Sequence, residues 1–185
     1  MTNRFVLAGI ALVVGLVLGW AVHGLLGYSQ TTDTATTYED WRVLCPAASA
    51  TAQHCTIEQD TVNSKTGQSV ARVAILTDKN KLSLITTVPL GVALQPGVSF
   101  AFGSDAPKTL PYRLCTAQGC VAEIAMDDKL QAGFDAGKDG HLVFTLPQAN
   151  AKPVTVPVSL KGFATAERAY RNAEAKRSSW FWRMF

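Results

Sequence analysis

The sequence predicts an all-β fold, an antiparallel β-sandwich or partly open barrel, with one N-terminal transmembrane helix and a C-terminal amphipathic helix. Short apolar or alternating runs separated by turn residues recur between Tyr38 and Leu160, which is typical of all-β domains. A long uncharged apolar stretch occupies the N-terminus, and the segment after Gly162 combines helical periodicity with basic and aromatic side chains. Four parts are predicted: an anchor at 1–27, a linker at 28–37, the β-domain at 38–166 and a basic-aromatic tail at 167–185.

The N-terminal segment is predicted to span a membrane. Residues 5–26, FVLAGIALVVGLVLGWAVHGLL, contain no Asp, Glu, Lys or Arg, and a helix needs about 20 residues to cross the hydrocarbon core. Arg4 precedes this stretch, whereas three acidic residues follow it before the next Lys or Arg. The positive-inside rule therefore places the N-terminus in the cytoplasm and the rest of the chain in the periplasm. A cleaved signal peptide has an apolar region of about 7–15 residues and a small-residue cleavage site, so we expect an uncleaved inner-membrane anchor.

Two glycines in this stretch are candidate contacts with a partner helix. Gly15 and Gly19 have the small-xxx-small spacing that lets membrane helices approach closely. The other interpretation is the ordinary glycine content of membrane spans. Residues 28–37, YSQTTDTATT, are polar and rich in threonine, and we expect them to separate the anchor from the folded domain.

Strands are expected wherever a short apolar or alternating run lies between turn signals. The turn sequences include KTGQ, TDKNK, QPG, AQG and KDG. In GVSFAFG, Val98, Phe100 and Phe102 share one side of the predicted strand, as the two-residue period of a strand requires. The expected strands lie at residues 40–45, 55–60, 69–76, 81–88, 97–103, 109–115, 120–126, 140–146 and 153–160.

Two segments have helical signatures. Residues 127–137 begin with Asp127 or Asp128 as a candidate N-cap and end at Gly137. The longer segment follows Gly162 and is amphipathic, although Arg177 interrupts its apolar face and RSS can divide it into a helix and a separate aromatic cap. The residues of that apolar face are Phe163, Ala166, Tyr170, Ala173, Trp180, Phe181 and Met184.

The four cysteines form two close pairs, Cys45 with Cys55 and Cys115 with Cys120. In an oxidising periplasm an even number of paired cysteines predicts two short-loop disulfides. A zinc site is the alternative, but the spacings C-x9-C and C-x4-C differ from the CxxC-like spacing of such sites. We therefore favour disulfides and predict no metal.

Charge is concentrated near the C-terminus. The last 25 residues carry six Lys or Arg against two acidic residues, a net of +4, whereas the other 160 carry eleven against twelve, a net of −1. The body of the chain therefore has no basic surface for nucleic acid.

The chain ends in SSWFWRMF. Aromatic and arginine side chains suit both the lipid headgroup region and the anchor positions of protein interfaces, so the tail is predicted to contact the membrane or a membrane partner. The candidate contact residues are Trp180, Phe181, Trp182, Arg183 and Phe185.

The sequence contains no catalytic motif. G-x-S-x-G, HExxH, GxGxxG, the P-loop and the haem motif CxxCH are absent, and the exported part has only His54 and His141 as histidines. Asp127 and Asp128 are interpreted as a helix cap rather than an acid–base pair. We therefore expect no catalytic residues and no cofactor. Aromatic residues interpreted as core rather than as a ligand cage are Trp41, Phe100, Phe102, Tyr112 and Phe134.

Four motifs occur in order between residues 38 and 166: DWRVLC, LITTVPLGVALQPGVSFAF, LPYRLCTAQGCVAEIAMDD and VTVPVSLKGFATA. Together they resemble the invasion-associated locus B family. The resemblance implies an exported bacterial all-β domain with disulfides Cys45–Cys55 and Cys115–Cys120 and without assigned catalytic residues. Typical members resemble secreted proteins with a cleavable signal peptide that end soon after PVSLKGF, whereas this chain has an apparent anchor and continues for roughly twenty residues.

The two departures from the family pattern both point toward the membrane. We expect a non-enzymatic, membrane-anchored periplasmic binding or scaffolding protein, an accessory subunit of a larger inner-membrane assembly such as a respiratory or photosynthetic complex. Its expected partners are an inner-membrane protein complex and lipid, with no nucleic acid or small-molecule substrate. The alternative, implied by the family name, is an envelope or secreted factor involved in host-cell invasion.

Overall fold

The computed structural model describes most of the β-domain and one short N-terminal helix. That helix covers residues 8–19, and its side chains are exposed. No helix in the described part of the chain combines the length and apolarity that crossing a membrane requires. The flanks of the predicted span, residues 5–7 and 20–26, lie outside the described residues. The described residues are 8–19, 33–47, 54–62, 68–78, 81–137, 139–148 and 152–178.

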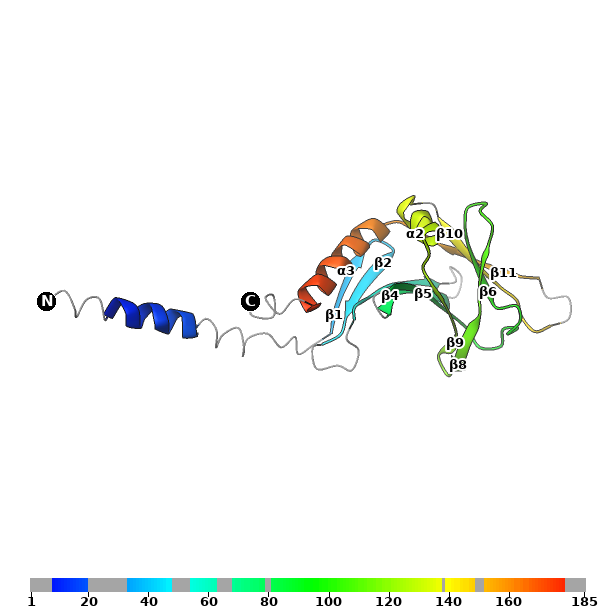
Figure 1. Cartoon of the computed structure of the whole chain (residues 1–185). Helices are drawn as coiled ribbons and strands as arrows, with labels where there is room; N and C mark the ends of the chain where they lie inside the picture. The colour runs from blue at the N-terminus through cyan, green and yellow to red at the C-terminus, as the bar shows by residue number, and fades with distance from the viewer. Residues whose placement is uncertain are drawn as a thin grey trace.

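The larger sheet has seven antiparallel strands in the order β1-β2-β3-β4-β5-β9-β8 (Figure 1). Strand β2 alternates buried and partly exposed residues, and its Trp41, Val43 and Cys45 all face the core. The strands are β1 (Thr34–Tyr38), β2 (Trp41–Cys45), β3 (Thr56–Val62), β4 (Ser69–Asp78), β5 (Lys81–Val88), β8 (Tyr112–Thr116) and β9 (Gly119–Ala125).

The smaller sheet has four antiparallel strands in the order β11-β10-β6-β7. The inward faces of the two sheets share one hydrophobic core, so the predicted β-sandwich-like architecture is confirmed. The strands are β6 (Val98–Phe102), β7 (Lys108–Leu110), β10 (Gly140–Phe144) and β11 (Val154–Val158).

Two helices complete the domain, α2 (Asp128–Asp135) and α3 (Phe163–Ser178). The N-cap of α2 is Asp127, whose carboxylate accepts a hydrogen bond from the Leu130 amide at 3.0 Å. This satisfies one of the free amides of the first helical turn. Lys108 also pairs with Asp127, and its hydrogen bond, together with that of the Leu130 amide, lowers the pKa of the carboxyl.

The predicted linker contains a strand. Thr34 to Thr37 form most of β1, which pairs with β2 in a register that sets Thr34 opposite Cys45. These residues are all exposed, so the strand has no buried face and no hydrophobic alternation to mark it in the sequence. The linker is therefore shorter than predicted. The expected strand at 109–115 is likewise divided at Pro111, which has no backbone donor.

An aromatic cluster fills the centre of the core. The Phe134 ring of α2 lies 5.7 Å from Phe100 and 5.0 Å from Phe102 of the smaller sheet and 4.8 Å from Phe163 of α3 (centroid distances). It also makes an edge contact with Trp41 of the large sheet at 6.3 Å. Trp41 joins the cluster through an edge contact with Phe163 at 5.0 Å. Each such pair contributes about 0.5–1.5 kcal/mol beyond area burial. The cluster thus ties both helices to the two sheets, and a side chain at Gly133 would collide with the Phe102 ring.

The segment between β11 and α3 is bonded to the large sheet at Ser159. The Ser159 carbonyl accepts hydrogen bonds from the Trp41 indole at 2.7 Å and from the Gln59 amide at 2.8 Å. The Ser159 amide in turn donates to the Gln59 side-chain oxygen at 3.0 Å. Gln59 is buried, so these bonds are made away from water, where an unpaired partner is costly. They fix where α3 begins.

We predict that Gln59→Leu destabilises the domain by about 1–3 kcal/mol, because the Ser159 amide loses its side-chain partner and its carbonyl keeps only Trp41. Chemical denaturation monitored by tryptophan fluorescence measures this. Gln118→Leu, on the exposed β8–β9 turn, is the matched control and should change stability by less than about 0.5 kcal/mol. Equal stabilities of the two variants would contradict the role given to Ser159.

Candidate functional site

Helix α3 is part of the folded domain. Phe163, Ala166 and Tyr170 are buried against the large sheet, and the Tyr170 hydroxyl lies 2.6 Å from the Thr77 hydroxyl. Burial raises the pKa of Tyr170. The predicted boundary between residues 166 and 167 falls inside this helix, so residues 167–178 continue an element of the domain.

The last turns of α3 are fixed to residues on both sides of a disulfide. Glu174 accepts a hydrogen bond from the Cys55 amide at 2.6 Å, and its other carboxylate oxygen lies 2.8 Å from Nδ1 of His54. Arg177 donates to the Pro46 carbonyl at 2.8 Å. Since Cys45 and Cys55 form a disulfide, the end of α3 is held to a covalently closed loop.

The start of β1 lies beside the same disulfide. Thr34 pairs with Cys45, and the Asp33 carboxylate accepts a hydrogen bond from the Ala47 amide at 2.8 Å. Figure 1 shows β1, β2 and α3 side by side. The first strand and the last helix therefore meet at one end of the large sheet. We call this end, with Asp33, Thr34, the Cys45–Cys55 disulfide, Glu174 and Arg177, the terminal pole.

The second disulfide lies at the opposite end of the large sheet. The antiparallel register sets the last residue of β5, Val88, opposite Cys120, which is bonded to Cys115. The first residue of β5, Lys81, pairs with Asp78 at the other end. Both predicted disulfides are confirmed, and they cross-link opposite ends of one sheet.

The end that carries the second disulfide also carries exposed leucines. Leu90 and Leu94, in the loop that leaves β5, are 56% and 57% exposed, and Leu114 on β8 is 54% exposed. Leu114 pairs with Val121, which in turn pairs with Thr87 near the end of β5. We call this group the leucine end; it consists of Leu90, Leu94 and Leu114. It is a candidate surface for contact with another molecule.

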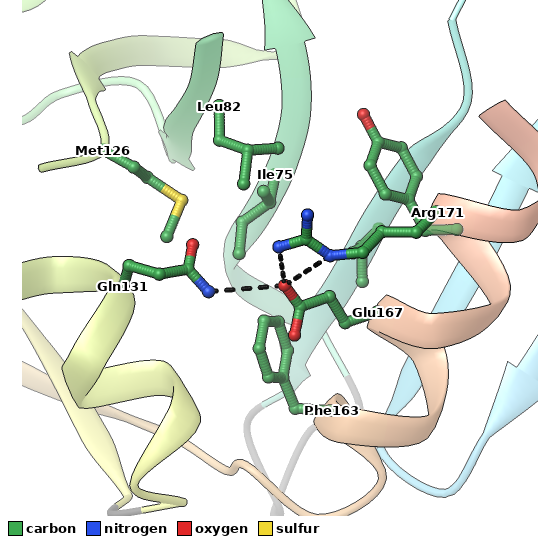
Figure 2. Close-up of a pocket in the computed structure, with 9 residues that line it drawn as sticks. Ile75, Leu82, Met126, Gln131, Phe163, Glu167 and Arg171 are labelled. Carbon is green, nitrogen blue, oxygen red and sulfur yellow. Dashed lines mark hydrogen bonds and ion pairs between the residues drawn. The ribbon is translucent and has the colours of Figure 1, made fainter. Parts of the chain in front are cut away.

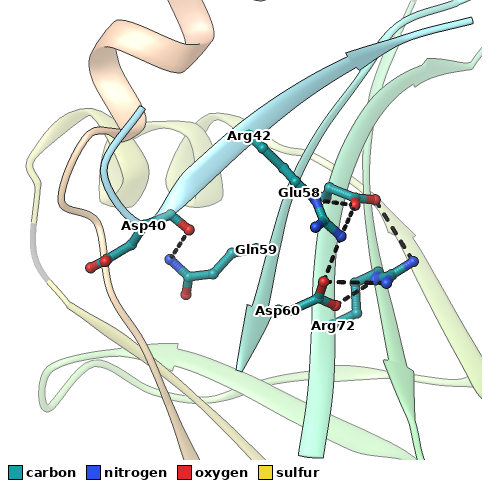
Figure 3. Close-up of polar contacts among 6 residues, drawn as sticks. All are labelled: Asp40, Arg42, Glu58, Gln59, Asp60 and Arg72. Atoms are coloured by element: carbon teal, nitrogen blue, oxygen red, sulfur yellow. Dashed lines mark hydrogen bonds and ion pairs between the residues drawn. The ribbon is translucent and has the colours of Figure 1, made fainter. Parts of the chain in front are cut away.

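The outer face of the large sheet carries a balanced charge network (Figure 3). Arg42 donates to Glu58 and Asp60, each at 2.5 Å, and Arg72 donates to Asp60 at 2.6 Å. The hydrogen bond that Arg72 donates to Asp60 raises the pKa of Arg72. Two arginines face two carboxylates across adjacent strands, so these groups are engaged with one another and act as a cross-strand tie.

A small cavity lies between α2, α3 and the large sheet (Figure 2). Its volume is about 10 Å³, room for about one water molecule and far below the few hundred Å³ of a ligand pocket. Glu167 closes it by accepting hydrogen bonds from Arg171 at 2.5 Å and Gln131 at 3.3 Å. The apolar walls come from Ile57, Ile75, Leu82, Met126, Phe163 and Tyr170.

The titratable residues singled out in the sequence do not converge. His54 pairs with Glu174 at the terminal pole, Asp127 caps α2, and His141 lies on β10 in the smaller sheet. Among the described residues, no three His, Cys, Asp or Glu side chains are placed to hold a metal ion. Four of the five aromatic residues assigned to the core are buried. The fifth, Tyr112, is half-buried on the edge strand β8, and burial raises its pKa.

The predicted membrane contacts remain predictions. Gly15 and Gly19 lie four residues apart on the helix at 8–19, and apart from neighbouring residues and the helix backbone no described atom lies within 4 Å of where a Cβ would stand. The aromatic contact residues lie outside the described residues: Trp180, Phe181, Trp182, Arg183 and Phe185.

The geometry defines a two-sheet, β-sandwich-like domain cross-linked at both ends of its larger sheet. A family model described as "Invasion associated locus B (IalB) protein" matches residues 41–171, so the chain belongs to the invasion associated locus B family. This match includes the first half of α3, in agreement with the burial of Tyr170.

The fold is also similar to that of a solved relative. The crystal structure of invasion associated protein B from Bartonella henselae aligns with a TM-score of 0.66 and 23% sequence identity, over 77% of this chain and 99% of that one. A search of curated protein sequences found no match. At this identity the likeness speaks for the fold alone.

We predict that Glu174→Gln loosens the end of α3, because it weakens two hydrogen bonds made by a charged, largely buried carboxylate. A loss of about 1–2 kcal/mol of local stability corresponds to roughly five- to thirtyfold faster amide exchange over residues 174–178. Hydrogen–deuterium exchange measures this. Glu123→Gln, which weakens an ion pair with Arg113 on the far strands, is the control. Unchanged exchange in the Glu174 variant would contradict the proposed attachment.

Proposed function

We propose that the chain is a non-enzymatic scaffolding protein, anchored in the inner membrane with its β-domain in the periplasm, and an accessory subunit of a larger membrane assembly. The observation that carries this proposal is the terminal pole. The strand that continues from the predicted anchor and the helix that leads into the aromatic tail meet at one disulfide.

The short linker strengthens the argument. Since β1 begins at Thr34, only residues 28–33 separate the predicted anchor from the sheet. Six extended residues span at most about 20 Å, so an anchor at 1–27 keeps the terminal pole close to the bilayer. Residues 179–185, which follow α3, span about 24 Å when extended. This reach supports a contact of the tail with the membrane surface or with the membrane-near part of a partner.

The described site geometry supports a scaffold rather than an enzyme. The cavity beneath α3 holds about one water molecule, and the carboxylates of the outer face are engaged by arginines. The described surface instead has two opposite ends that are available for contact with other molecules, the terminal pole and the leucine end. The terminal pole faces the bilayer in this proposal, and the leucine end faces the periplasm, where a partner subunit can cover Leu90, Leu94 and Leu114.

A second candidate function follows from the family description. Invasion associated locus B gives the family its name, which favours an envelope or secreted factor that acts on a host cell. The two proposals differ in the fate of the N-terminus. N-terminal sequencing of mature protein from fractionated cells separates them, since a start after residue 30 refutes the anchor and favours secretion.

We predict that the tagged full-length chain, purified from membranes in mild detergent, recovers a defined set of membrane proteins in fixed proportion. Deleting residues 179–185, which leaves α3 intact, should reduce that recovery at least several-fold, because the aromatic contacts are lost. Replacement of the same seven residues by a Gly/Ser segment is the length-matched control and should behave like the deletion. Recovery of the unaltered chain as a lone monomer would refute the accessory-subunit role.

We predict that Leu90→Ser combined with Leu94→Ser weakens partner recovery in the same purification. Both side chains are more than half exposed, so the change should alter stability by no more than about 0.5 kcal/mol. Thermal unfolding of the isolated variant is the control. Unchanged partner recovery with unchanged stability would show that the leucine end is not a contact surface.

A further inference from the structure

Helix α3 separates its charges between two faces. Arg168, Arg171 and Lys176 are exposed. The two acidic side chains of the helix turn toward the domain, with Glu167 15% and Glu174 20% exposed. Glu167 is bonded to Gln131 and Arg171, and Glu174 to His54 and the Cys55 amide. The carboxylates thus attach the helix, and its outward face is cationic.

The sign of the charge also changes along this side of the domain. The exposed acids Glu39 and Asp40 lie on the β1–β2 turn, next to Gly162, where α3 begins. The basic residues follow in the second and later turns, and the helix ends at the terminal pole. The exposed side chains therefore change from mainly acidic at the β1–β2 turn to mainly basic along the later turns of α3, which lead to the terminal pole.

The outward face of α3 has no large apolar side chain. Between its basic residues lie only Ala164, Thr165, Asn172 and Ala175. Protein interfaces bury a core of aromatic and large apolar side chains beside their arginines, and this face has arginines but no such core. A cationic face with only small or polar side chains between its charges is instead complementary to a layer of phosphate groups.

We propose that the outward face of α3 binds anionic phospholipid headgroups through Arg168 and Lys176, while Arg171 stays paired with Glu167. This inference rests on the proposed anchoring, which keeps the terminal pole within about 20 Å of the bilayer. At that distance screening by salt, with a Debye length of about 8 Å, weakens attraction unless the helix approaches the surface. The contact therefore orients the domain, with α3 toward the lipid and the leucine end away from it.

The test uses the full chain reconstituted in nanodiscs of phosphatidylcholine alone or with about one third phosphatidylglycerol. Hydrogen–deuterium exchange of amides 170–178 should be at least threefold slower in the anionic discs, and the difference should vanish at about 0.5 M salt. Arg168→Gln combined with Lys176→Gln should abolish the difference. Equal exchange in both lipids would overturn the proposal.

A matched control separates lipid contact from helix stability. Basic residues in the last turn also stabilise a helix through its dipole. The Arg168→Gln, Lys176→Gln variant and the control variant are therefore also compared in phosphatidylcholine discs, where a loss of helix stability alone would already accelerate exchange. Lys129→Gln combined with Lys152→Gln removes two exposed charges elsewhere and should keep the lipid-dependent difference. If it loses that difference equally, the proposal is wrong. A chain that enters neither disc refutes the anchor, and with it this inference, whereas entry without a lipid effect refutes this inference alone.

Discussion

The arrangement depends on the attachment of Ser159 to the large sheet. Its carbonyl accepts from Trp41 and Gln59, and its amide donates back to Gln59. Ser159 lies in the segment that joins the smaller sheet to α3, and these bonds hold it against the start of β2 and the middle of β3. Helix α3 follows with Phe163 in the aromatic cluster. In its last turns Glu174 accepts a hydrogen bond from the Cys55 amide. The attachment, the packing of Phe163 and the Glu174 hydrogen bond together direct the last turns of α3 to the end of the sheet where β1 begins.

Much of the fold was predictable because its physical signals are local. Strands with one buried face alternate in the sequence, as in β2, and the two disulfides join cysteines close enough in sequence to be paired. The N-cap Asp127 has its partner three residues away. Strand β1 was missed because an exposed edge strand shows no alternation. The helix after Gly162 was predictable from its apolar period, but the contact of Tyr170 with Thr77 was not, because Thr77 is distant in sequence.

The terminal pole was not visible in the sequence for the same reason. Asp33, Pro46, Cys55 and Glu174 are brought together only by the strand register and by the Ser159 attachment. The aromatic tail and the apolar N-terminal stretch were each conspicuous in the sequence, but their relation was not. In the structure, β1, which follows the apolar stretch, and α3, which precedes the aromatic tail, meet at the Cys45–Cys55 disulfide. This arrangement supports a domain that is held at one surface by both ends.

The central claim is that the terminal pole faces the bilayer and the leucine end faces away. Paramagnetic relaxation from a gadolinium-bearing lipid, measured by NMR on the full chain in nanodiscs, tests it most directly. If the terminal pole faces the bilayer, the amide signals of Thr34, Cys55 and Lys176 should broaden strongly, and those of Leu90, Leu94 and Gln118 should broaden little. Equal broadening at the two ends, or stronger broadening at the leucine end, would show that the terminal pole does not face the bilayer.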